Sequence, residues 1–114
     1  MNEDKDILVS AYGGLGQVRV ALQRGNYAVF QGALTGIYNM LGGFIQSSKA
    51  LSADRRAKLT AFNQSIFDLR NAIVTQIEIN RKDFKTAVEM ANADERLKLC
   101  EEALEAKIDE WYKP

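Results

Sequence analysis

The chain has 114 residues, the size of one domain, so we expect a single domain over residues 1–114. Its formal net charge is zero, which argues against nucleic acid as a partner because nucleic-acid-binding proteins need a basic surface. The only proline is the last residue, and no stretch alternates strictly between apolar and polar residues. These features argue against strands and predict an all-α fold with long helices.

The first predicted helix covers about residues 4–24. Its apolar positions recur every three or four residues, as on one buried face of a helix: Leu8, Ala11, Leu15, Val18 and Leu22. Gly13, Gly14 and Gly16 each cost a helix up to ~1 kcal/mol relative to alanine. They indicate either a kink or, as the commoner reason, a close approach by another helix.

A stop and a restart follow at residues 24–26. Gly25 suits the left-handed residue that ends a helix, and Asn26 suits the cap of the next one. So short a connection makes the first two helices an antiparallel hairpin. The second helix, about residues 26–49, has the core line Phe30, Leu34, Ile37, Leu41 and Phe44. Its polar residues and glycines argue against a membrane span, and Gly32 with Gly36 is a small-xxx-small pair suited to close helix contact.

The third predicted helix starts at the cap residue Ser52. Its core line stays in phase to residue 91: Leu59, Phe62, Ile66, Leu69, Ile73, Ile77, Asn80, Phe84, Val88 and Ala91. Such a helix is ~58 Å long and exceeds its partners, so we expect a break, a kink or an overhang, with the most polar stretch, residues 80–83, as its place. The fourth helix starts with a capping box at residues 92–95. Its inner stripe is Leu97, Cys100, Leu104, Ile108 and Trp111. The result is an elongated, antiparallel four-helix bundle in up-down-up-down order.

The sequence contains no catalytic or metal-binding motif, and we expect no cofactor. Cys100 is the only cysteine and the chain has no histidine, so we expect a small core residue rather than a disulfide or a nucleophile. The start MNEDKD does not resemble a signal peptide, which predicts a cytoplasmic protein. The third helix is basic and the fourth acidic, which predicts ion pairs between them, each worth under ~1 kcal/mol; a charged docking patch is the alternative.

The first two helices carry more apolar surface than the bundle can bury. Second apolar stripes run along both helices: Val9, Tyr12, Gly16 and Val20, then Val29, Ala33, Gly36 and Met40. Such a surface needs a cover, so we predict a binding protein for an amphipathic client segment. The candidate partner-binding residues lie off the main core lines: Tyr12, Val29, Met40, Phe67 and Val74.

Three alternatives stay open at this stage. The protein could be a homodimeric structural or regulatory bundle without a client. The second helix could instead lie at the centre of the bundle and need no outside partner. A small all-α enzyme ranks third, because Arg19, the most embedded arginine, has no evident partner for binding an anionic substrate.

Residues 7–48 resemble the flagellin export chaperones (FliS family). Ala11-Tyr12-Gly13-Gly14 stands where that family has its first helix motif, and Arg24-Gly25-Asn26-Tyr27 stands where it has the turn into the second helix. Residues 37–41, residues 67–70 and Trp111 are also similar, so that the resemblance covers about two-thirds of the chain. It implies a cytoplasmic helical chaperone of flagellar secretion. Such a chaperone binds the C-terminal helical region of flagellin in an apolar groove and prevents polymerisation before export.

Overall fold

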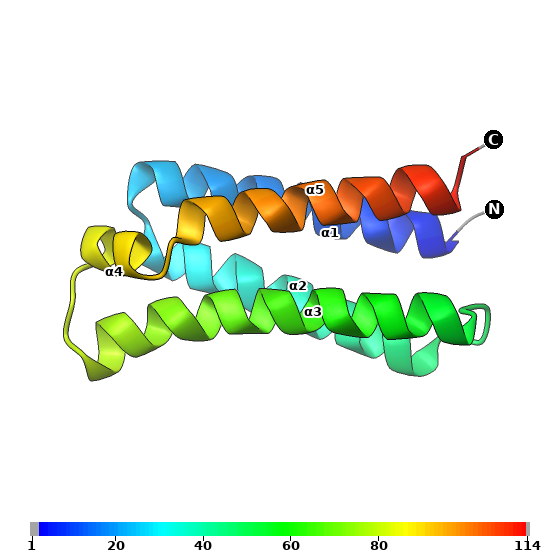
Figure 1. Ribbon diagram of the computed structural model, residues 1–114, viewed down its shortest axis with the longest axis horizontal. Coiled ribbons are helices and arrows are strands. Elements are labelled where there is room, and N and C mark those ends of the chain that lie inside the picture. The colour runs from blue at the N-terminus through cyan, green and yellow to red at the C-terminus, as the bar shows by residue number, and fades with distance from the viewer. Residues whose placement is uncertain (1–2, 114) are drawn as a thin grey trace.

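A computed structural model describes residues 3–113 of the chain, and its regular structure is entirely helical. The elements are α1 (Glu3–Arg24), α2 (Tyr27–Ser47), α3 (Ala53–Val74), the π-helix η1 (Thr75–Ile79), α4 (Phe84–Met90) and α5 (Ala93–Trp111). The long helices α1, α2, α3 and α5 run in alternating directions, with the start of α1 and the end of α5 at the same end (Figure 1). The predicted all-α class is confirmed, and α4 is a short additional helix formed by the end of the predicted third helix.

The α1–α2 hairpin forms where the sequence predicts it. Gly25 has a φ of 68°, in the left-handed region, and the side chain of Asn26 accepts a hydrogen bond from the Val29 N–H at 3.1 Å. A Cβ on Gly14 would stand 2.9 Å from Cγ1 of Ile37, so this glycine allows the two helices to approach closely. The predicted close packing is therefore confirmed at Gly14.

Four other glycines of the hairpin have open space where a side chain would stand. At Gly13 and Gly16 on α1, and at Gly32 and Gly36 on α2, an added Cβ would meet no heavy atom within 4 Å. The close contact that we predicted for the Gly32–Gly36 pair is thus absent from the described part of the chain. These positions form an open surface instead.

The third predicted helix breaks at the expected place. Ser52 caps α3 by accepting a hydrogen bond from the Arg55 N–H, and α3 continues into η1 before the chain leaves the helix at residues 80–83. A π-helix bonds i to i+5 and so turns later side chains away from the line of the preceding α-helix. Beyond Ile73 the predicted core line is confirmed in part: Asn80 is exposed, whereas four later members are half-buried and pack against the core, namely Ile77, Phe84, Val88 and Ala91.

The start of α5 differs from the predicted capping box. Asn92 has a φ of 52° and its side chain makes no capping hydrogen bond. A capping side chain reaches the helix from an extended backbone, whereas asparagine is among the few residues that adopt the left-handed region readily. Asn92 therefore makes a tight turn between α4 and α5, and the capping-box prediction is wrong.

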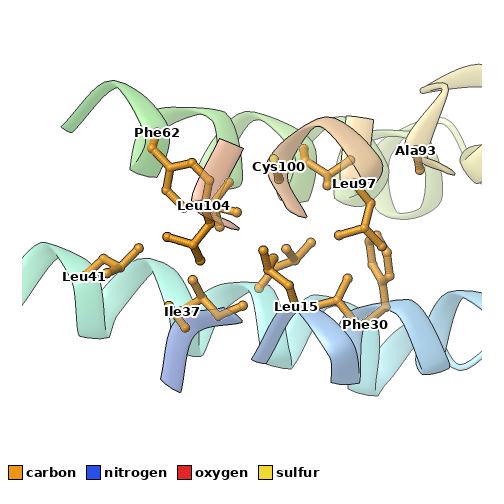
Figure 2. Packing of buried hydrophobic residues seen from close by; sticks show 14 of the residues in the cluster. Leu15, Phe30, Ile37, Leu41, Phe62, Ala93, Leu97, Cys100 and Leu104 are labelled. Carbon is orange, nitrogen blue, oxygen red and sulfur yellow. The ribbon is translucent and has the colours of Figure 1, made fainter. Parts of the chain in front are cut away.

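Buried side chains from all four long helices meet in one core. Figure 2 shows Leu15 of α1 and Ile37 of α2 pointing toward Phe62 of α3 and Leu104 of α5. Cys100 lies in this core, where burial raises the pKa of its thiol, so the prediction of a core cysteine is confirmed.

Two residues at the edges of the core carry polar contacts. Asn63 is buried, and its Nδ2 donates a hydrogen bond to the carbonyl oxygen of Tyr38 at 3.0 Å, which ties α3 to the backbone of α2. Trp111 is half-buried at the end of α5 and packs against the core, as predicted. The guanidinium of Arg55 lies 5.0 Å from the centre of the Trp111 ring.

Candidate functional site

An open groove runs between α1 and α2 on the solvent-facing side of the hairpin. Its longer section has a volume of about 700 Å³ and is lined by Ser10, Gly13, Gly14, Gln17, Val29, Gly32, Ala33, Gly36, Ile37 and Met40. A second section of about 480 Å³ lies near the hairpin turn. The two sections share Gly13, Gln17 and Val29, so they form one continuous groove.

The floor of the groove is largely bare backbone. Four glycines line it with open space where a Cβ would stand: Gly13, Gly16, Gly32 and Gly36. Small residues let a second helix come close to the backbone. The surface that the internal packing leaves unused is therefore shaped to receive a helix.

The groove is bordered by apolar side chains that project into solvent. On α1 this is Val20, and on α2 these are Val29 and Met40, which expose 47% and 37% of their surface. Among the residues that line the two sections, Arg24 near the hairpin turn is the one charged side chain. An elongated apolar surface with little charge is typical of a protein-binding site.

Three of the predicted partner-binding residues lie on the hairpin, and the structure brings two of them into the groove. Val29 and Met40 both line it. Tyr12 faces α5 instead, where its hydroxyl donates a hydrogen bond to Oε2 of Glu105 at 3.2 Å, and this bond raises the pKa of Tyr12. Tyr12 thus lies beside the groove rather than in it.

The remaining two predicted residues, Phe67 and Val74, lie on α3 and are half-buried. The ring of Phe67 packs against Tyr38 of α2, with ring centres 4.8 Å apart. Because the α1–α2 groove contains no residue of α3, the five predicted residues do not form one surface.

The polar residues that line the α1 side of the groove were not predicted from the sequence. Ser10, Gln17 and Arg24 are spaced by seven residues, which places them along one side of the helix. The same seven-residue spacing links the two groove residues Val29 and Gly36 on α2. A comparison of these two lines could have found the groove from the sequence.

Two other surface hollows carry more charge. The hollow between α3 and α5 includes Asp68 and Arg96 beside the exposed Leu99. The hollow at the end of α5 includes Lys5 and Asp109. Since charged side chains must lose water when an apolar partner covers them, these hollows are poorer sites for an apolar helix than the α1–α2 groove.

The acidic side of α5 is paired with α1. Arg19 donates one hydrogen bond to Asp94 at 2.5 Å and another to Glu101 at 2.6 Å, and the bond with Glu101 raises the pKa of the guanidinium. Arg19 therefore has partners, contrary to the sequence analysis. In the described part of the chain no ion pair joins α3 to α5, so the ion pairs predicted there are also absent.

Within residues 3–113 the structure shows no group of three or more acidic or cysteine side chains placed to hold a metal ion. None of the helices described has the length and apolar character needed to cross a membrane. Comparisons of the chain with known protein families, with curated proteins and with solved structures find no match. The resemblance to the flagellin export chaperones therefore stays a prediction.

Proposed function

We propose that this protein is a non-enzymatic binding protein whose α1–α2 groove receives an amphipathic helix of a client protein. The observation that carries the proposal is the open, charge-poor groove with a glycine floor and exposed Val29 and Met40 at its border. Proteins commonly bind an amphipathic helix by laying its apolar face into such a groove. A methionine side chain adapts its shape to the helix that it meets.

In this proposal the fold is an elongated, antiparallel up-down-up-down bundle of α1, α2, α3 and α5, with α4 as a short addition before the last helix. The resemblance of residues 7–48 to the flagellin export chaperones supports flagellin as the client and the cytoplasm as the location. The C-terminal helical region of flagellin then occupies the groove and is kept from polymerising before export.

The surroundings of Arg19 favour binding over catalysis. An all-α enzyme acting on an anionic substrate needs cationic side chains that are free to contact it. Arg19 is already held by Asp94 and Glu101, whose negative charges repel an anion. Arg19 therefore serves the packing of α1 on α5.

The proposal is tested by placing a charge in the groove. Val29→Glu and Met40→Glu should each weaken the binding of a C-terminal flagellin fragment by at least about tenfold, because the client would cover an unpaired carboxylate. Far-UV circular dichroism should be unchanged, since both side chains are exposed. Ile79→Glu is the matched control, because Ile79 is 71% exposed and lies on η1, away from the groove.

Isothermal titration calorimetry measures the binding in each variant. If the unmodified protein ignores the fragment, or if both groove variants bind it as the control does, the chaperone proposal is wrong. A bundle without a client, of the homodimeric structural or regulatory kind, is then the better description. If the groove variants unfold, the two residues belong to the core.

A further inference from the structure

Two charges of opposite sign stand near opposite ends of the groove side of α1. Asp6 and Arg24 are 18 residues apart in the sequence, which is five turns of an α-helix, so they project from the same side about 27 Å apart. Both side chains are exposed, and neither takes part in an ion pair within residues 3–113. The groove side of α1 is therefore negative near one end and positive near the other.

The middle of this charge pair lies level with Gly36 on α2. Gly14 lies against Ile37, so Leu15, which is midway between Asp6 and Arg24, lies level with Gly36. A two-fold axis can pass through the level of Leu15 and Gly36. If it lies in the plane of the groove side of α1 and α2 and runs perpendicular to these helices, it places a second copy face to face with the first and antiparallel to it. Asp6 of each copy then stands opposite Arg24 of the other.

The same axis matches projecting side chains with gaps on α2. Residues 32 and 40 are equally distant from Gly36, as are residues 29 and 43. The axis therefore places one member of each pair opposite the other member in the second copy. Met40 then stands over Gly32 of the second copy, and Val29 stands over Gly43. Both glycines have open space where a Cβ would be, and both larger side chains project into solvent.

We propose that a second copy of this chain covers the groove when no client is bound. The two copies are antiparallel, with α1 on α1 and α2 on α2. The molecule measures 45 × 23 × 18 Å, so one long face offers roughly 800 Å², the area that each partner buries in an interface of standard size. The apolar contacts supply affinity, and the Asp6–Arg24 pairs select the antiparallel direction.

The pairing adds a form of regulation to the proposed function, and this regulation rests on the proposed function. Because the second copy and the client use the same groove, self-association and client binding exclude each other. The second copy protects the apolar surface until a client displaces it. The pairing itself does not depend on the identity of the client.

The experiment is a charge exchange followed by sedimentation velocity over a range of protein concentrations. Asp6→Arg and Arg24→Glu should each weaken self-association by at least about tenfold, because each change sets like charges opposite one another at two places. An equimolar mixture of the two variants should associate again, since every charge in the mixed pair meets an opposite one. Glu102→Lys, an exposed charge reversal on α5, is the control and should leave self-association unchanged.

A second variant tests the position of the axis. Gly36→Cys places a thiol where the two copies meet at the axis, so mild oxidation should give a disulfide-linked dimer. Ala57→Cys, exposed on α3, should form no disulfide link under the same conditions. The native Cys100 is buried in the core and does not interfere.

The pairing is overturned by an unmodified protein that is monomeric at every concentration, or by a mixture of the charge variants that fails to associate. A monomer that binds the flagellin fragment removes this inference and leaves the proposed function in place. A dimer that passes the mixing test and ignores the fragment supports the pairing and removes the proposed function. A dimer that binds the fragment without dissociating shows that the copies do not cover the groove.

Discussion

Gly13 and Gly14 are neighbours on α1, yet a methyl group added to each would meet different surroundings. At Gly13 the space is open, so Gly13→Ala should stabilise the protein by up to about 1 kcal/mol through helix propensity alone. At Gly14 the new Cβ would press on the buried Ile37, and overpacking costs about 1–3 kcal/mol. We therefore expect Gly14→Ala to lower the free energy of unfolding, measured with urea. Equal effects of the two substitutions would contradict the close approach.

The candidate site was predictable from the sequence only in part. Val29 and Met40 were found because an uncharged second stripe marks a surface that needs covering. Phe67 was misplaced because a helical period gives the angle of a side chain but not the helix that fills the adjacent space, and here Tyr38 fills it. Asn63 was missed because no local pattern marks a polar side chain that finds its partner on another helix.

Helix ends at α1, α2 and α3 were predictable because they depend on local interactions. Gly25 needs only its own backbone conformation, and Asn26 and Ser52 cap N–H groups three residues away. The π-helix η1 was not predictable in the same way. Its Glu78 accepts a hydrogen bond from the Tyr27 hydroxyl at 2.8 Å, a contact that bridges 51 residues. Tertiary contacts of this kind override the local pattern.

Burial of Tyr27, together with its hydrogen bond to Glu78, raises the pKa of the phenol to about 12. An unfolded tyrosine has a pKa of about 10, so the folded protein holds this proton more tightly than the unfolded chain does. The resulting stabilisation is complete below about pH 10 and is lost as the pH rises through about 12. The difference in unfolding free energy between the unmodified protein and Tyr27→Phe should therefore shrink across this interval.

Urea unfolding of both proteins at a series of alkaline pH values measures this difference. The tyrosinate absorbance, followed in parallel, should show one group fewer titrating near pH 12 in Tyr27→Phe. A stability difference that is constant with pH would mean that the Tyr27–Glu78 contact does not hold η1 in solution.

The four long helices form a ring of contacts, which closes where α1, the first helix, meets α5, the last. Arg19 ties these helices by reaching residues 75 and 82 positions further along the chain. The sequence showed that α5 is acidic, but α5 has both α1 and α3 as neighbours, and charge counts favoured α3. Within residues 3–113 the ion pairs to α5 come from Arg19 on α1 and not from the more numerous basic residues of α3.

The two carboxylates that Arg19 contacts should differ in how much they stabilise the contact between α1 and α5. The Glu101 side chain is 25% exposed and the Asp94 side chain is 75% exposed. Since solvent screens an exposed pair, Asp94→Asn should cost less than about 0.5 kcal/mol of unfolding free energy. Glu101→Gln weakens a charge-assisted bond in a half-buried place and should cost about 1 kcal/mol.

A double-mutant cycle with Arg19→Met separates the pair from its surroundings. Arg19→Met alone leaves the half-buried Glu101 carboxylate unpaired, so it should cost more than the double variant Arg19→Met/Glu101→Gln, in which that charge is gone. Urea unfolding at low and high salt gives the coupling energies, and salt should reduce the Asp94 coupling more than the Glu101 coupling. Equal couplings that salt reduces equally would show that α1 and α5 are held by apolar packing, with the ion pairs as surface additions. A larger and salt-resistant Glu101 coupling would mean that the ring of helices closes on this half-buried pair.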